Sequence, residues 1–182
     1  MRWVMVCLLL LGCAHQPPVG HPVQVEDVPF ALNGRISVKH NGTRDSAGLR
    51  WEHRLEADEI LLLTPLGQSA ARIYRDNALA TLDVGARHYQ DADVESLMMQ
   101  VLGWRLEMSR LHHWVLGMLA DGGVVLERDK LNRLSILRED GWEVRYLAYA
   151  DDQVNSLPAR MQLSRENLQL MLLIDEWDWK IK

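Results

Sequence analysis

The stretch ILLLTPLGQSAARI, residues 60–73, gives the clearest indication of how this chain folds. It predicts a strand, a tight turn and a second strand, because Pro65 presets the backbone angle φ and Gly67 accepts a positive φ. Leu66 stands between them at the tip, where turn residues are normally polar and solvated. Two interpretations are open. Leu66 either folds back and packs beneath the hairpin, or it is exposed in order to meet an apolar partner.

On both sides of this hairpin, apolar residues recur with a period of two, which is typical of strands with one buried face. Turns are indicated at Asn41-Gly42 and at Asp140-Gly141, the latter a strong hairpin signal. Residues 59–64 differ, because four consecutive aliphatic side chains predict a strand covered on both faces. The predicted strands are residues 30–39, 46–52, 59–64, 69–75, 79–84, 87–90, 124–127, 133–138, 142–149, 159–164 and 168–177.

Between the sixth and seventh predicted strands the period changes to that of amphipathic helices. Asp93 is placed to cap a helix over residues 94–102, which Gly103 ends, and a second helix is predicted over residues 109–119. The fold class is therefore mainly β (α+β), a curled antiparallel sheet of about eleven strands with two helices across its concave side. Helices too small to fill that space would leave a hydrophobic pocket, whereas a flatter sheet would pack without a cavity.

The start of the chain resembles a bacterial lipoprotein leader. Arg2 precedes an apolar run too short to remain as a transmembrane helix, and small residues then precede Cys13. We expect residues 1–12 to be removed as a signal peptide and Cys13 to be acylated; the alternative is an ordinary signal peptide with an incidental cysteine. Residues 13–29 then form a proline-rich tether, and Ala14 favours the outer membrane, because many lipoproteins retained in the inner membrane carry Asp there.

Composition and motifs limit the classes of function. A net charge of −5 offers no basic surface for nucleic acid. The sequence shows no phosphate-binding loop, no serine-hydrolase elbow and no metal-ligand spacing, so we expect no catalytic site, no cofactor and no metal. The adjacent His112 and His113 diverge by about 100° on a helix and cannot chelate one metal. The acidic residues Asp175, Glu176 and Asp178 are more typical of a solvated strand end than of a cation site.

Several short motifs occur together in order and, with the leader, resemble the LolB family of outer-membrane lipoproteins, which receive other lipoproteins from the periplasmic carrier LolA. The likeness covers nearly the whole chain after the leader. The motifs are NGRISV (33–38), AGLRW (47–51), LTPLGQ (63–68), LGW (102–104), LHHWVLG (111–117), RD (128–129), DGW (140–142), LP (157–158) and IDEW (174–177).

The resemblance implies an unclosed antiparallel β-barrel with a helical lid over an apolar cavity that shelters the acyl chains of cargo. It places the protein in the outer membrane, lipid-anchored and facing the periplasm. The implied partners are a periplasmic lipoprotein carrier resembling LolA, acylated lipoprotein cargo and outer-membrane lipid. We expect residues 30–182 to form one LolB-like lipid-binding domain and the protein to be a monomer. By position, the loop of Pro65, Leu66 and Gly67 would pass lipid to the membrane, with Leu66 as its protruding residue.

Our candidates for the cavity lining come from assigning faces to the predicted strands and helices, not from a motif. They are Ile36, Leu49, Trp51, Leu61, Leu63, Trp104, Leu111, Trp114, Val115, Trp142, Val144 and Tyr146. Arg35 falls on the polar side of its strand, where a surface position is the default, although an inward twist would turn it toward a lipid headgroup.

The chain departs from the family pattern in places that leave the geometry of the lid open. Glu107 stands where the family often has Pro, and Met118-Leu119 replaces a turn that usually contains Pro, which predicts a longer second helix. Asn132 replaces a common Gly, which Asn can do because it tolerates a positive φ. Two other classes of function stay open: an assembly lipoprotein that docks a protein without binding lipid, and a lipid hydrolase, for which no nucleophile–base pair is visible.

Overall fold

The computed structural model describes residues 28–120 and 122–179. The expectations for the leader, for acylated Cys13 and for most of the tether lie outside these residues. The elements are β1 (Phe30–His40), β2 (Thr43–Arg54), β3 (Ala57–Leu63), β4 (Ser69–Arg75), β5 (Ala80–Val84), β6 (Arg87–Asp91), α1 (Val94–Leu102), α2 (Met108–Val115), β7 (Val124–Arg128), β8 (Leu134–Glu139), β9 (Trp142–Tyr149), β10 (Pro158–Arg165) and β11 (Leu168–Asp178).

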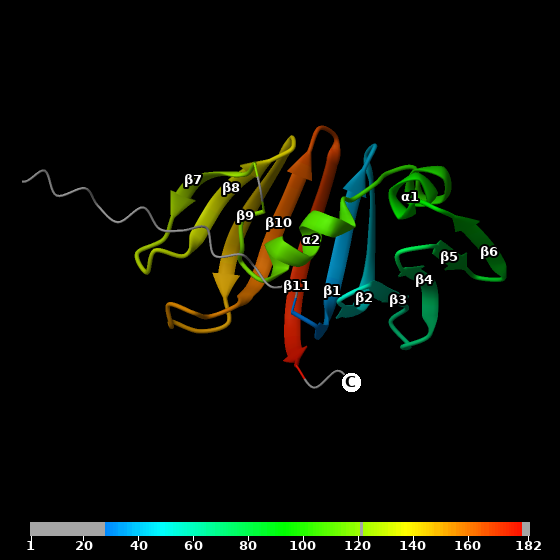
Figure 1. Ribbon diagram of the computed structural model, residues 1–182, viewed down its shortest axis with the longest axis horizontal. Coiled ribbons are helices and arrows are strands. Elements are labelled where there is room, and N and C mark those ends of the chain that lie inside the picture. The colour runs from blue at the N-terminus through cyan, green and yellow to red at the C-terminus, as the bar shows by residue number, and fades with distance from the viewer. Residues whose placement is uncertain (1–27, 121, 180–182) are drawn as a thin grey trace, which may run out of the picture.

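All the strands belong to one antiparallel sheet of 11 strands, in the order β6-β5-β4-β3-β2-β1-β11-β10-β9-β8-β7. The first and last strands of the chain pair at its centre, while β6 and β7 form two unjoined edges. The sheet curls, with α2 lying across β11 and β1 and with α1 beside β5 and β6 (Figure 1). The predicted unclosed barrel with a helical cover is therefore confirmed.

Glycine at position 34 allows β1 and β11 to approach closely at the centre of the sheet. The register of β1 against β11 shifts between Asn33 and Gly34, which marks a bulge. A Cβ atom on Gly34 would lie 2.0 Å from the carbonyl oxygen of Leu173. Because no side chain fits at that distance, only glycine at this position allows the two backbones to lie so close together at the bulge.

The strands and helices begin and end close to the predicted residues, with two differences. First, β2 begins at Thr43 instead of residue 46. The Asn41-Gly42 turn has positive φ at both residues, so His40 and Thr43 pair directly on either side of it. Second, the longer second helix predicted to residue 119 is wrong. The helix ends at Val115, because Gly117, two residues later, has the left-handed backbone conformation, with φ at +71°.

The C-terminal end of α2 has the hydrogen bonds of a Schellman motif. The Gly117 amide donates to the Trp114 carbonyl at 3.0 Å, and the Met118 amide donates to the His113 carbonyl at 2.9 Å. Asn132 has the positive φ that its place in the pattern requires, at +64°.

The core lies between the concave face of the sheet and the helices. Its largest members are Trp51, Trp114 and Trp142, each fully buried and each on a different element, β2, α2 and β9. The predicted cap of α1 is present, since the Asp93 carboxylate accepts from the Ser96 amide at 2.8 Å. Among the described residues, no helix has the length and apolar character needed to cross a membrane.

Candidate functional site

The turn between β3 and β4 holds Leu66 out into solvent, with 87% of the residue exposed. The Gly67 amide donates to the Thr64 carbonyl at 2.8 Å, and the Thr64 amide donates to the Gln68 carbonyl at 2.8 Å. The Thr64 hydroxyl also accepts from the Gln68 amide at 3.2 Å. Gly67 adopts the positive φ predicted for it, at +78°. The turn is braced by these bonds, and Leu66 is exposed instead of folded back beneath the hairpin.

An apolar cavity lies between the concave face of the sheet and the helical segment. Its volume in this structure is about 60 Å³, and no polar surface is exposed inside it. Its floor comes from β1, β2, β3, β4, β10 and β11, and its roof comes from α1, α2 and the connection between them. The lining residues are Ile36, Val38, Leu49, Trp51, Ile60, Leu62, Ile73, Met98, Trp104, Leu106, Met108, Leu111, Leu163, Leu170 and Leu172.

The structure brings together the candidates Ile36, Leu49, Trp51, Trp104 and Leu111 around this cavity. Sequence reasoning missed the inward-facing residues of β10 and β11, although the alternation along β11 carries the signal for them. It also missed the roof residues at 98, 106 and 108. Met98 lies on the predicted helical stripe. Leu106 lies in the connection between the helices, which has no periodicity to reveal it, and Met108 is the first residue of α2, one residue before the predicted start of that helix.

The candidates on the C-terminal half of α2 and on β9 do not line the cavity, because they pack against one another. Trp114, Val115, Trp142 and Val144 are fully buried, and Tyr146 is nearly so. The rings of Trp114 and Trp142 are tilted, with centroids 6.0 Å apart. The Tyr146 hydroxyl donates to the Trp114 carbonyl at 3.0 Å. These residues form the packed core that fixes α2 on the sheet.

Leu61 and Leu63 are also outside the cavity, because they lie on the opposite face of the sheet. The buried residue of β3 at this level is Ile60, which pairs with the buried Trp51. Since successive side chains alternate between faces, Leu61 and Leu63 point outward. Both are half-buried on that outer face.

Two carboxylates, the buried Glu139 and the half-buried Glu107, attach α2 to the sheet on one side. Glu139 of β8 accepts hydrogen bonds from the Trp114 indole at 3.0 Å and from the Arg110 guanidinium. Glu107, at the start of α2, accepts from the Trp142 indole and from Arg165 at 2.5 Å. Hydrogen bonds to buried charged groups are stronger than neutral ones, so these contacts hold α2 in place.

A second polar cluster borders the opposite side of α2. The Asp58 carboxylate accepts from the Trp51 indole and the His53 ring at 2.7 Å each, and pairs with Arg75 at 2.5 Å. Burial alone would raise the pKa of Asp58, but the His53 hydrogen bond and the Arg75 charge outweigh it and lower that pKa. The His53 ring stacks on His112 of α2, with centroids 5.0 Å apart. α2 is therefore held on both sides.

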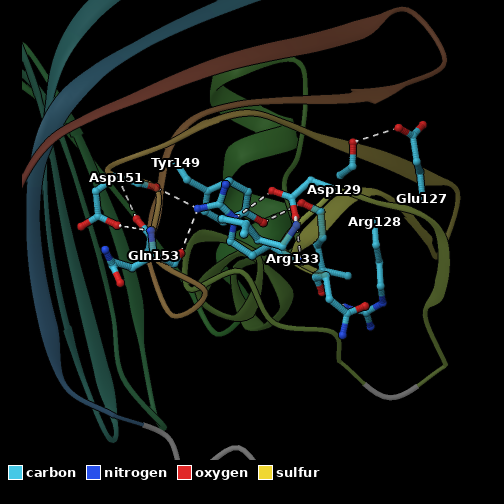
Figure 2. Close-up of polar contacts among 12 residues, drawn as sticks. Glu127, Arg128, Asp129, Arg133, Tyr149, Asp151 and Gln153 are labelled. Carbon is cyan, nitrogen blue, oxygen red and sulfur yellow. Dashed lines mark hydrogen bonds and ion pairs between the residues drawn. The ribbon is translucent and has the colours of Figure 1, made fainter.

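A third polar cluster, shown in Figure 2, ties the β7–β8 turn to the β9–β10 loop. Arg133 donates to Asp129 at 2.8 Å and to the carbonyls of Asp151 and Gln153 at 2.8 and 3.0 Å. Its guanidinium lies 4.1 Å from the centroid of the Tyr149 ring. Burial raises the pKa of Tyr149 to about 12. Because every member has a partner within the cluster, its role is to brace these loops.

Arg35 lies on the outer face, as the default interpretation predicted, and not in the cavity. Its guanidinium donates to both carboxylate oxygens of Asp175, at 3.0 and 3.2 Å. The two side chains are 63% and 53% exposed. Glu176 lies beside Asn33 at 3.4 Å, so this strand end is a solvated polar surface.

An open antiparallel sheet wrapped around a wholly apolar cavity, covered by helices and carrying an exposed leucine on a braced loop, defines a protein that binds apolar ligands. The family model described as "Outer membrane lipoprotein LolB" matches residues 28–177. The chain belongs to the LolB family and is an outer-membrane lipoprotein.

Relatives with that name align over nearly their full length. The outer-membrane lipoprotein LolB of Nitrosomonas europaea is 36% identical over 199 residues, covering 99% of this chain and 93% of the relative. The LolB of Azoarcus sp. is 34% identical over 173 residues, covering 93% and 90%. The fold is also that of a LolA-superfamily protein from N. europaea, with a TM-score of 0.50 at 10% identity over 86% of this chain and 88% of that protein.

Proposed function

We propose that this chain, an outer-membrane lipoprotein receptor of the lipoprotein localisation system, holds the acyl chains of its cargo in the apolar cavity and releases them to the membrane beside Leu66. The observation that carries the proposal is a cavity whose inner surface is entirely apolar. A long acyl chain buried there is stabilised by about 0.8 kcal/mol per methylene, or roughly 10 kcal/mol in all. Transfer through water without such a site would forfeit that free energy.

The cavity has to enlarge before it can hold an acyl chain. Its volume of about 60 Å³ lies well below the roughly 300–1,000 Å³ of sites for small apolar ligands. Since α2 is held to the sheet by hydrogen bonds on one side and by the stacked His53 and His112 rings on the other, we propose that α1 and the connection after it move instead. Gly103, at φ +77°, begins that connection, and Met98, Trp104 and Leu106 of this segment form part of the roof.

We further propose that cargo arrives from a periplasmic carrier resembling LolA and that the receptor acts as a monomer. The sequence shows no nucleotide-binding motif, so each handover has to proceed from lower to higher affinity, from carrier to receptor to bilayer. Acylated Cys13 would keep the receptor at the membrane throughout. We expect no turnover of acylated substrates, and release of free fatty acid from a bound lipopeptide would contradict this.

Uptake can be tested with the chain carrying Cys13→Ala, which removes the expected acylation site. We expect it to bind a fluorescent diacylated peptide, and Leu49→Glu, which puts a charge into the cavity lining, to weaken that binding. A protein that binds no fluorescent acyl group at all would contradict the cavity proposal.

The role of Leu66 is tested separately, in the lipid-anchored chain. Leu66→Glu removes an exposed apolar side chain that makes no part of the cavity lining. Folding and cargo uptake should therefore be unchanged, while delivery of a lipoprotein to vesicles becomes slower. Leu55→Glu, also exposed but on a different loop, is the matched control. Delivery at the normal rate by the Leu66 variant would refute a role for the loop tip.

The assembly-lipoprotein alternative rests on the open edge of the sheet at β7. Val124 and Leu126 of this edge strand are both exposed, which suits a protein contact. Native mass spectrometry of the purified chain separates the two functions, because only the receptor should retain acyl ligands. Replacing Val124 and Leu126 with Lys should leave cargo uptake unchanged if the receptor function is correct.

A further inference from the structure

We propose that an acyl chain of the cargo occupies a second apolar site, the outer groove, on the face of the sheet opposite the cavity. The outer groove lies between the loop of residues 64–67 and outward-facing residues of β1, β2, β3 and β11. Its volume is about 540 Å³, against about 60 Å³ for the cavity. The outer groove is therefore large enough for a small apolar ligand without any rearrangement. The inference rests on the proposed function, which supplies the acyl chain.

The outer groove exists because small residues meet at its floor. Ser37 of β1 pairs with Ser46 of β2, and the neighbouring outward position on β2 is Gly48, which pairs with Leu63. A Cβ atom on Gly48 would lie 3.2 Å from the Leu63 Cβ, so even a methyl group would crowd this point. The outer face is hollow here because three successive outward positions of neighbouring strands have little or no side chain.

Large apolar side chains surround this floor. Leu63 lines one side, and Met171 and Leu173 of β11 line the other, each of them half-buried. Half-buried aliphatic side chains on an outer sheet face favour a methylene chain over a polar ligand. The one charged lining residue is Arg35, whose bonds to Asp175 use two of its five N–H groups, leaving donors for an ester oxygen at the head of an acyl chain.

The position of the outer groove links the cavity to the Leu66 loop. Pro65 and Gly67 form part of its wall, while Leu66 projects beyond them into solvent. Ile36 lines both the cavity and the outer groove. The pairing of β2 with β3 ends at Gly48, whereas β2 continues to Thr43 along β1. The edge of β2 over residues 43–47 therefore has no β3 partner. A chain that leaves the cavity past this edge reaches the outer groove and then the loop tip.

Photocrosslinking tests this assignment in the lipid-anchored full chain, reconstituted in phosphatidylethanolamine–phosphatidylglycerol vesicles. The probe is a diacylated peptide with a diazirine at the end of one acyl chain. We expect adducts on cavity residues and, during transfer to the vesicles, on Met171 and Leu173. Ser37→Trp should remove the outer-groove adducts, keep those in the cavity and slow transfer by about tenfold, equivalent to a barrier raised by about 1.4 kcal/mol.

Two controls keep the result interpretable. Gln169→Trp changes an outward residue of β11 that does not line the outer groove, and it should transfer cargo at the normal rate. Ser46→Trp fills the outer groove from the neighbouring strand and should repeat the effect of Ser37→Trp if that variant folds poorly.

Three outcomes would overturn the proposal. Adducts confined to the cavity under all conditions, or normal transfer by both tryptophan variants that fill the outer groove, would leave the cavity proposal standing and remove this one. Outer-groove adducts obtained only when the diazirine is on a vesicle phospholipid would refute cargo as the source of the chain. If adducts form neither in the outer groove nor in the cavity, the proposed function itself is refuted.

Discussion

Replacing Leu97 with Ala removes a buried side chain that holds α1 on the sheet without lining the cavity. Leu97 is 1% exposed, and α1 packs against β5 and β6. It is absent from the residues around the cavity, whereas its neighbour Met98 is among them. Changes of Leu to Ala in a packed core cost about 2–5 kcal/mol. Because Leu97 is one of three buried residues on a short helix, much of that loss falls on the docking of α1.

The size of the effect on binding follows from the closed cavity. A cavity of about 60 Å³ cannot hold an acyl chain, so part of the binding free energy is used to displace the roof. If Leu97→Ala removes about 2 kcal/mol of roof docking, the affinity for acyl peptide should rise roughly 30-fold, since each 1.4 kcal/mol is a factor of ten. The variant is therefore expected to be less stable and yet to bind more tightly.

The assay is a titration of a fluorescent diacylated peptide, accompanied by thermal unfolding, in the chain carrying Cys13→Ala. Leu137→Ala is the matched control, because Leu137 is 0% exposed, lies on β8 and does not line the cavity. It should lose similar stability with no gain in affinity. The reasoning is refuted if Leu97→Ala binds no more tightly than the parent chain, or if both variants gain equally.

Three further predictions concern the fold. Gly34→Ala should lower the melting temperature measured by circular dichroism by several degrees, because the added Cβ would lie 2.0 Å from the Leu173 carbonyl oxygen. Overpacking of this kind costs about 1–3 kcal/mol, and each kcal/mol shifts the midpoint by about 2–4 °C. An unchanged midpoint would contradict the close approach. Because the pKa of Asp58 is lowered on folding, its stabilisation is present above the unfolded pKa of about 4 and is lost as the pH falls through the folded pKa. Urea midpoints of Asp58→Asn should therefore change less with acidification than those of the parent chain, and equal slopes would argue against the shift. In ultraviolet titration, Tyr149→Phe should lack one tyrosine that ionises near pH 12, and a difference spectrum appearing near pH 10 would refute that value.

Alternation and capping residues were enough to predict the strands and α1. Both are local signals, set by the two-residue repeat of a strand and by the hydrogen bond of Asp93. The apolar stripe predicts a helix to Leu119, but the left-handed Gly117 makes α2 end at Val115, four residues earlier. A periodic pattern records which face is apolar, but a single residue with positive φ decides where the backbone leaves the helix.

The cavity lining was only partly predictable, for two physical reasons. In the run of residues 60–63 every side chain is apolar, so alternation carries no information about which face is inside; the pairing of Ile60 with Trp51 decides it. On β9, alternation predicts that Trp142 and Val144 face inward, as they do, but the Trp114 side chain of α2 packs on that part of the sheet. Which part of a concave face stays uncovered depends on where a helix docks, and that is set by distant contacts such as Trp114 with Glu139.

The exposed leucine is limited in what it can do by its size. Burying one Leu side chain is worth about 1.5–3 kcal/mol, well below the roughly 10 kcal/mol of a buried acyl chain. Leu66 therefore cannot hold the receptor at the membrane, and that task falls to the acylated N-terminus expected at Cys13. It can, however, lower a barrier by an amount comparable to its own burial, which corresponds to a rate change of roughly 10- to 150-fold. The Leu66→Glu variant should for this reason stay in the membrane fraction while its delivery rate falls, and a variant lost from the membrane would show that the loop anchors the protein.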